Sequence, residues 1–302
     1  MLFSNGFHQK ILVGICAYNE ENNIGKLLST LLKKQNLPSN SKILVVCSGC
    51  TDKTPQIVKE LCKSDARIEL VVEKFRKGKA NALNKIFRLA ASVDFLILVN
   101  GDALPKHGSI EKLILNLQNE KVGAAFARPV PLNKIIGVAN RIVHIVWKLH
   151  HYVSLYKAPK LSAELCAIRT ECLREIPEHI ATDEPYIELS IRKQGYAISY
   201  APDAVVFIRC PTSLIDLFKQ RKRIWTGHLQ VRKMTDFVVS TSDFRNIAWI
   251  VSMLKLDEIP YGFLGAIIEG LAYLMAKLNL MNGKIPYAWE PVKSTKTAIT
   301  SF

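Results

Sequence analysis

The stretch Phe95-Leu96-Ile97-Leu98-Val99-Asn100-Gly101-Asp102 decides the fold. Its five apolar residues run without interruption and stop at an Asn-Gly turn, which is typical of a short strand buried on both faces. Asp102 is the first acid that follows, and ligands of open α/β sheets bind beyond the carboxyl ends of the strands. Two interpretations of Asp102 remain open: a ligand for a phosphate-bound divalent cation, and an ordinary turn aspartate.

Three similar apolar runs precede this strand, at 11–17, 43–47 and 68–72. Helical patterns follow each of them, from Ile24 to before Pro38, from Thr54, and over 80–91. This alternation predicts a mostly parallel, doubly wound α/β sheet flanked by helices. The first strand lacks a following G-x-G-x-x-G and the chain lacks G-x-x-x-x-G-K-[ST], which argues against a nicotinamide site and a P-loop.

The composition predicts a folded protein with an anionic partner. The 302 residues are 49% hydrophobic and carry a net charge of +15, which suits nucleotide phosphates, anionic lipids or nucleic acid. No basic-aromatic pattern supports nucleic acid. The seven cysteines are irregularly spaced, so we expect reduced thiols in a cytosolic compartment, and the first residues lack the features of a signal peptide.

Polar residues at successive strand ends carry a family resemblance. The segments 15–20, 45–52, 77–84 and 100–102 resemble the donor-binding half of family 2 glycosyltransferases, which have the GT-A fold, and the likeness extends over roughly residues 8–230. It implies that Ala17, Tyr18 and Glu20 border the base and ribose, that Asp52 contacts the base, and that Lys79 lies near the base and diphosphate. Asn100, Gly101 and Asp102 match the D-x-D motif, with Asp102 binding Mn²⁺ or Mg²⁺ and Asn100 replacing the first acid.

The second half carries an acidic pair. Residues 124–129 read as a strand, 161–169 resemble the family's acceptor-loop strand, and Thr182-Asp183-Glu184 opens a helix before a strand over 196–206. The resemblance puts Glu184 in the catalytic second place, where a carboxylate accepts the proton of the acceptor hydroxyl. The alternative is a helix N-terminus that simply favours Thr and acids. The residues do not choose between Asp183 and Glu184.

A predicted helix over 213–234 contains Gln220-Arg221-Lys222-Arg223-Ile224-Trp225. This resembles the family's Q-x-x-R-W motif, but Trp225 stands one residue after the position of the motif's tryptophan. Its side chain is therefore rotated by about 100° around the helix axis from that position. That departure argues against processive polymerisation. Arg221 or Arg223 is expected to neutralise the leaving diphosphate, with Trp225 on the acceptor side; the alternative is a solvated basic face.

Two segments suggest a membrane. Residues 135–156 form a basic, tryptophan-bearing amphipathic pattern, which fits either a membrane interface or a helix packed into the core. Residues 261–280, preceded by the apolar 247–256, are long enough to span a bilayer, but Glu269 is costly there. We therefore expect an in-plane or re-entrant hairpin on the anionic, cytoplasmic face of the membrane.

The predicted organisation is a GT-A domain over 1–240 and an apolar membrane-associating segment over 241–302. The domain would comprise a donor half, about 8–105, and an acceptor half, about 106–240, with an amphipathic insertion at about 133–157. The expected activity is inverting, metal-dependent transfer from a nucleoside diphosphate sugar, foremost a UDP-sugar, to a polyprenyl or other lipid-linked or membrane-proximal glycan. The alternatives are a nucleotidyltransferase, which would want a glycine-rich first loop, and a non-catalytic nucleotide-sugar-binding protein at the membrane.

Overall fold

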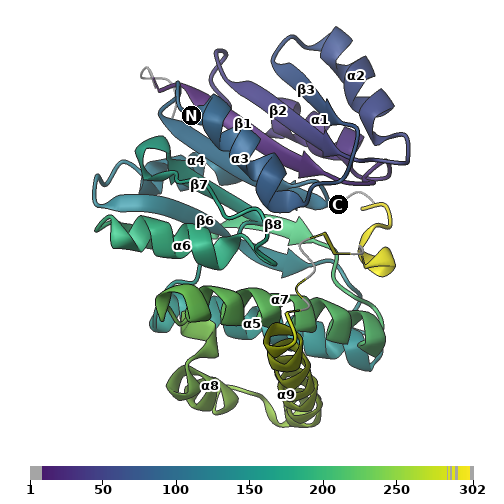
Figure 1. Cartoon of the computed structure of the whole chain (residues 1–302), viewed down its shortest axis with the longest axis vertical. Coiled ribbons are helices and arrows are strands. Elements are labelled where there is room, and N and C mark those ends of the chain that lie inside the picture. Colours follow the sequence, from purple (N-terminus) through teal and green to yellow (C-terminus); the bar gives the residue numbers. More distant parts are fainter. Residues whose placement is uncertain (1–8, 284, 286–287, 290–291, 300–302) are drawn as a thin grey trace.

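The computed structural model describes residues 9–283, 285, 288–289 and 292–299. Within them, eight strands form one sheet in the order β3-β2-β1-β4-β7-β6-β8-β5 (Figure 1). The strands are β1 (Ile11–Ala17), β2 (Lys42–Ser48), β3 (Ile68–Glu73), β4 (Phe95–Asn100), β5 (Ala103–Pro105), β6 (Val122–Pro131), β7 (Leu165–Arg169) and β8 (Ala197–Ile208).

The first half of the sheet is parallel, as the strand-helix alternation predicts. β1 lies between β2 and β4 and pairs in parallel with both. Helices α1 (Ile24–Lys34) and α2 (Thr54–Ser64) contribute to the apolar cluster on one face, and α3 (Lys79–Ala90) to that on the other. Gly14 permits this close packing, since a Cβ there would lie 2.5 Å from the Ile86 side chain of α3.

The second half of the sheet is mixed. β7 is antiparallel to both β4 and β6, β6 and β8 are parallel, and β5 is antiparallel to β8. The short strand β5 and the helix α4 (Ser109–Asn116) do not stand out in the sequence pattern, because each is brief and takes its pairing from distant residues. Helix α6 (Glu184–Lys193) covers the α3 face, and the 3₁₀ turn η1 (Thr170–Cys172) follows β7.

The remaining helices lie below the sheet in Figure 1. They are α5 (Val138–Tyr156), α7 (Leu214–Thr235), α8 (Phe244–Val251) and α9 (Ile259–Met281), with 3₁₀ turns η2 (Ser240–Ser242), η3 (Leu256–Glu258) and η4 (Lys293–Thr295). α5 and α7 form the layer nearest the sheet, and α8 and α9 form the end of the molecule farthest from β3.

Helix α5 is packed against protein, as the core-packed alternative predicts. Part of its basic face contacts neighbouring residues: His144 Nε2 lies 2.7 Å from the Asn133 carbonyl oxygen, and His151 Nδ1 lies 2.6 Å from the Tyr200 hydroxyl. Lys148 pairs with Glu258 at 2.5 Å. These contacts support the core-packed alternative for α5, and a membrane contact of this helix stays a prediction.

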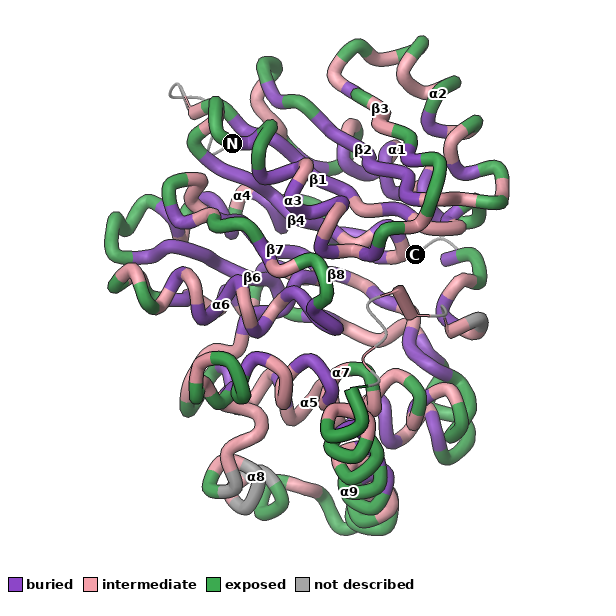
Figure 2. Tube along the Cα trace, viewed as in Figure 1, coloured by how far each residue is buried: buried purple, intermediate pink, exposed green. Residues whose placement is uncertain are grey.

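Helix α9 is different, because most of its apolar side chains are exposed (Figure 2). Among the described residues, Leu256–Met281 is the stretch long and apolar enough to cross a bilayer by length and composition. Its mid-helix acid is not stranded: Glu269 pairs with Arg221 of α7 at 2.5 Å and accepts a hydrogen bond from Trp225 Nε1 at 2.6 Å. The exposed apolar face of α9 consists of Ile259, Phe263, Ile267, Leu271, Leu274, Met275, Leu278 and Met281.

The end of the chain does not stay with α9. Residues 292–299, which we call the C-terminal tail, return to the donor half, where the chain is yellow in Figure 1. Asn22 Nδ2 and Lys26 Nζ donate to the carbonyls of Lys296 and Ile299 at 3.2 and 2.8 Å. The Ile299 amide donates to Asn23 Oδ1 at 3.0 Å. The tail thus contacts the donor half, and the association of 241–302 with a membrane stays a prediction.

Candidate functional site

The site is built where β1, β2 and β4 end side by side. Ala17 ends β1, and Asn19 turns the chain with a left-handed φ of 54° while its side-chain oxygen accepts from the Thr51 amide at 2.9 Å. After β4, Gly101 lets the turn close on Glu20, because a Cβ at Gly101 would lie 2.9 Å from Glu20 Cγ. The turn after β1, the Thr51 loop and the turn after β4 therefore meet at this end of the strands.

Glu20 and Asp102 meet at this edge, with a lysine from the C-terminal tail between them. Lys296 Nζ contacts Glu20 Oε1 and lies 3.7 Å from Asp102 Oδ2. Burial, together with the Asp102 charge, raises the pKa of Glu20 to about 8, against the opposing effect of Lys296. Burial alone lowers the pKa of Lys296, but the charges of Asp102 and Glu20 reverse this and raise it. The two acids thus form a position that attracts positive charge.

Asn100 is bonded to a carboxylate from another part of the chain. Its Nδ2 donates to Glu164 Oε2 at 2.8 Å, and its backbone amide donates to the Glu164 carbonyl at 3.3 Å. Burial and the Asp102 charge raise the pKa of Glu164 to about 7, while the hydrogen bond from Asn100 opposes the shift.

The nucleotide-side residues of the prediction lie on the same edge. The guanidinium of Arg76 stacks 3.9 Å from the centre of the Tyr18 ring. Asp52 accepts from the backbone amides of Glu21 and Thr54, both at 3.0 Å, so one carboxylate ties the first loop to the start of α2. Burial alone raises the pKa of Asp52, and these hydrogen bonds outweigh it and lower the pKa.

The acidic pair lies across the site from Glu20, at the start of α6. Asp183 Oδ2 lies 3.0 Å from Lys79 Nζ, which projects from the first residue of α3. Burial raises the pKa of Asp183 despite this pairing. Burial alone also raises the pKa of Glu184, but the charges of Lys79, Lys160 and Arg223 outweigh it and lower the pKa. Glu184 is therefore the member of the pair that is readily ionised.

Helix α7 packs closely, at Gly227, against Thr182, the residue that precedes the acidic pair. A Cβ at Gly227 would lie 1.8 Å from Thr182 Oγ1 and 2.9 Å from the Thr182 backbone nitrogen. Only a residue without a side chain lets α7 approach the loop before α6 this closely.

The three predicted residues of α7 do not act together. Arg223 lies within electrostatic reach of Glu184 and of Lys296, so it belongs to the site. Arg221 and Trp225 both bind Glu269, and the Trp225 ring packs edge-on against Tyr273 with centres 5.2 Å apart. The structure thus directs Arg221 and Trp225 to the contact between α7 and α9, away from the predicted diphosphate and acceptor positions, because the late tryptophan faces that helix.

The residues at the Asp102 edge fit a divalent cation held partly by a ligand. Within the described residues, no group of three or more His, Cys, Asp or Glu side chains is arranged to hold a metal by itself. Mg²⁺-type sites commonly use one or two carboxylates and take their remaining ligands from substrate phosphates and water. Asp102 has a partly exposed carboxylate, and the ammonium of Lys296 already occupies the electronegative position beside it.

Glu164, Lys160 and Lys296 also surround the site, and sequence reasoning did not single them out. Glu164 directly precedes β7, so its place beside Asn100 follows once β4 and β7 are known to pair. Lys160 affects the pKa of Glu184 from the loop before β7. Lys296 follows α9 in a segment without a periodic pattern, and nothing in the sequence signals its return to Glu20.

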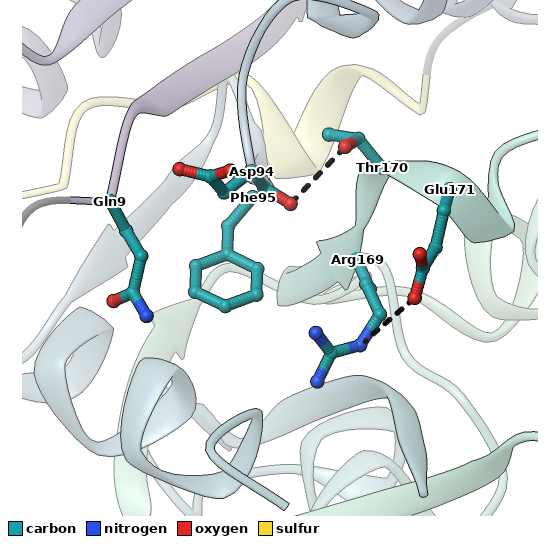
Figure 3. Close-up of a pocket in the computed structure, with 6 residues that line it drawn as sticks. All are labelled: Gln9, Asp94, Phe95, Arg169, Thr170 and Glu171. Carbon is teal, nitrogen blue, oxygen red and sulfur yellow. Dashed lines mark hydrogen bonds and ion pairs between the residues drawn. The ribbon is translucent and has the colours of Figure 1, made fainter. Parts of the chain in front are cut away.

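A separate pocket opens at the other end of β4. It is lined by Gln9, Asp94, Phe95, Arg169, Thr170 and Glu171 (Figure 3). Thr170 Oγ1 donates to the Asp94 carbonyl at 3.2 Å, and Arg169 pairs with Glu171 at 3.6 Å. Phe95 begins β4 and Asn100 ends it. This pocket therefore lies at the opposite end of β4 from Glu20 and Asp102.

Comparison with known proteins agrees with this architecture. The profile of the family described as Glycosyl transferase family 2 matches residues 12–169. The poly-beta-1,6-N-acetyl-D-glucosamine synthase of Staphylococcus epidermidis is 23% identical over 257 residues, which are 78% of this chain and 61% of that protein. A probable glycosyltransferase of Bacillus subtilis, YdaM, is 24% identical over 235 residues, 74% of this chain and 56% of that protein. The chain thus spans about three fifths of the length of these curated relatives.

Solved structures share the fold. The mannosyltransferase PcManGT from Pyrobaculum calidifontis, in complex with GDP-Man and Mn²⁺, superposes with a TM-score of 0.62 at 21% identity, over 94% of this chain and 82% of that one. TarS 1–349 of S. aureus, in complex with UDP-GlcNAc, gives a TM-score of 0.51 at 14% identity, over 91% and 92%. The predicted GT-A fold is confirmed, and the chain belongs to glycosyl transferase family 2.

Proposed function

We propose that this chain transfers a sugar, with inversion, from a nucleoside diphosphate sugar to a glycan acceptor at a membrane. The observation that carries the proposal is the meeting, at the carboxyl ends of β1 and β4, of two separate acid groups. Glu20 and Asp102 form the donor side, and Asp183 and Glu184 form the acceptor side with Lys79 beside them. Inverting transfer needs both a diphosphate site and a carboxylate base.

Glu184 is the proposed base. A base has to be ionised and unpaired at working pH, and the surrounding cations lower the pKa of Glu184. Asp183 is committed to its ion pair with Lys79 at 3.0 Å. In this proposal Glu184 removes the proton of the acceptor hydroxyl as that oxygen attacks the anomeric carbon, and Asp183 holds Lys79 in place as a positioning residue.

The donor side binds the nucleotide and its diphosphate. Tyr18, backed by Arg76, offers a ring face to a base, and Asp52 holds the loop next to it. Asp102 would hold Mn²⁺ or Mg²⁺, which supplies Lewis-acid charge to the departing diphosphate when bound. Arg223 adds positive charge from α7. A UDP-sugar is the proposed donor, and UDP-GlcNAc is the first to test because TarS was solved with it and a related synthase is named for N-acetylglucosamine.

The exposed apolar face of α9 supports a membrane-proximal acceptor. Phe263 is 70% exposed and Leu271 is 53% exposed, and the face continues to Met281. Exposed apolar area of this extent along one helix is typical of an interfacial helix. We propose that α9 lies on the anionic cytoplasmic leaflet and brings the site near a polyprenyl or other lipid-linked glycan.

Donor turnover tests the catalytic proposal. The protein would be incubated with UDP-, GDP- and dTDP-sugars, with and without Mn²⁺, and with lipid-linked glycan acceptors, and release of nucleoside diphosphate would be followed. We expect release with a UDP-sugar in the presence of Mn²⁺, and loss of it in Asp102→Ala. The absence of release from every donor, or equal release by Asp102→Ala, would contradict the proposal.

Flotation tests the membrane proposal. Vesicles containing anionic lipid should carry the wild-type protein, and Phe263→Ser with Leu271→Ser should reduce the floating fraction. Leu89→Ser is the matched control, since Leu89 is equally exposed, at 53%, on α3. Substitution is preferable to truncation here because removing the end of the chain also removes Lys296 from Glu20. Equal flotation of the α9 variant and the wild type would contradict an α9 contact.

A further inference from the structure

Asn100 and Glu164 are joined by the register of the sheet. β4 and β7 are antiparallel, and Val99 pairs with Leu165, so the next residues outward are Asn100 and Glu164. Their backbones continue the ladder at 3.3 Å, and Asn100 Nδ2 donates to Glu164 Oε2 at 2.8 Å. Two paired strands therefore hold the amide and the carboxylate together, which is a firmer arrangement than a contact between two loops.

The hydrogen bond explains why residue 100 is an amide. Two carboxylates at this separation would repel, and one of them would have to take up a proton. Asparagine has the shape of aspartate but donates a hydrogen bond, so it accepts a neighbouring glutamate without that cost. The pair therefore carries at most one negative charge, as a single aspartate at position 100 would.

The charge of the pair lies beside Asp102. Asp102 and Glu184 are both within electrostatic reach of Glu164, and Asn100 is separated from Asp102 only by Gly101. Asn100 also lines the small cavity between the ends of β1 and β4, together with Ala163, Lys79 and Asp183. Glu164 is thus at the junction of the donor and acceptor sides.

We propose that Glu164 supplies the second carboxylate of the cation and diphosphate site, in place of an acid at position 100, and that Asn100 orients it. This inference rests on the proposed function, because it assigns a charge to the same donor site. Asn100 then acts as a positioning residue that works through Glu164.

Measuring Mn²⁺ binding tests whether Glu164 supplies the carboxylate that position 100 lacks. The free Mn²⁺ signal in electron paramagnetic resonance would be titrated with protein in the presence of UDP, so that turnover is not needed. Glu164→Gln should weaken Mn²⁺ binding by about tenfold or more, the loss typical of removing a group that supports a metal site. The amide that this substitution introduces can still accept a hydrogen bond from Asn100, so the variant should fold, and circular dichroism would verify this.

A double variant makes the test specific. Asn100→Asp with Glu164→Gln exchanges amide and carboxylate while keeping one of each, and should restore Mn²⁺ affinity to within about threefold of wild type, a free-energy difference below about 1 kcal/mol. Glu175→Gln is the matched control, since Glu175 is an exposed acid paired with Arg88. It should leave Mn²⁺ affinity unchanged.

The outcomes separate this inference from the proposed function. Wild-type affinity in Glu164→Gln, or a double variant no better than Glu164→Gln, would overturn the role of Glu164 while the donor site stands. A wild-type protein that binds no Mn²⁺ with UDP would overturn both.

Discussion

Lys79 and Lys296 reach the two sides of the site from very different parts of the fold. Lys79 begins α3, which packs on the sheet, and pairs with Asp183 at 3.0 Å. Lys296 lies in the C-terminal tail and contacts Glu20, with Asp102 at 3.7 Å. The acceptor side therefore takes its balancing charge from a helix packed on the sheet, while the donor side receives its charge from a tail segment that makes side-chain-to-backbone hydrogen bonds.

Because of this difference, we expect the two sides of the site to respond differently to substitution. Losing the lysine or its partner on the acceptor side disturbs packed helices. Losing Lys296 should disturb mainly the tail, because its partners Glu20 and Asp102 lie in turns that follow strands.

The largest effect is expected at the proposed base. Glu184→Gln keeps the size of the side chain and removes its ability to take a proton, so the transfer rate should fall by about 10²–10⁴-fold. Single-turnover measurement of nucleoside diphosphate release would report this. Asp183→Asn is the comparison: if it abolishes turnover while Glu184→Gln retains most of it, the two acids have been assigned the wrong way round.

Gly227→Ala should disturb the acceptor side without touching a charge. The new Cβ would lie 1.8 Å from Thr182 Oγ1, so α7 or the loop before α6 has to move. We expect a loss of about 3 kcal/mol in the free energy of unfolding, the upper end for overpacking. Urea unfolding would measure it. Gly270→Ala, in α9, is the control, since nothing lies within 4 Å of its Cβ position; equal losses in the two variants would refute the steric explanation.

Removing one partner from each side compares the two lysines directly. Asp183→Ala leaves Lys79 unpaired and should cost about 2 kcal/mol, less than the roughly 3–5 kcal/mol of a fully buried pair because the Lys79 side chain is 37% exposed. Lys296→Met should cost less, about 1 kcal/mol, because burial already favours the protonated, neutral form of Glu20. Urea unfolding of both variants at neutral pH checks the order, and a larger loss in Lys296→Met would reverse the comparison.

Proton uptake by Glu20 gives a pH dependence of stability with a defined direction. Its pKa is raised from 4.5 to about 8, so the folded protein binds a proton that the unfolded chain releases. This contribution to stability is complete below about pH 4.5 and is lost as the pH rises through about 8. Glu20→Gln should therefore flatten the decline of stability over that interval, measured by urea unfolding at several pH values. An unchanged slope would show that Glu20 titrates normally.

The donor half of the fold was open to prediction because its signals are local. β1, β2, β3 and β4 are short apolar runs, and the helices between them have clear apolar periodicity. Their polar ends have to meet, since parallel strands share a carboxyl edge. The basic face of α5 left two interpretations open for the opposite reason: its partners Glu258 and Tyr200 are distant in sequence, so the pattern alone could not show these protein contacts.

The site residues also divide into those with a local sequence signal and those whose place depends on distant pairing. Asp102, Glu20 and the acidic pair follow strand ends or open a helix, and the family resemblance of these local segments singled them out. Glu164 needs the antiparallel pairing of β4 with β7, and Lys296 needs the path of the chain after α9. Glu269 is the instructive case, because an acid that seemed costly in an apolar helix is paired with Arg221 and Trp225.

Binding of UDP with Mn²⁺ tests the division of the site most directly. Isothermal titration calorimetry would compare the wild type with Asp102→Ala and Glu184→Gln. We predict that Asp102→Ala loses affinity for the UDP–Mn²⁺ complex by at least about tenfold, or about 1.4 kcal/mol, whereas Glu184→Gln binds it as the wild type does. Unchanged affinity in Asp102→Ala, or equal loss in both variants, would contradict a donor side at Asp102 and a base at Glu184.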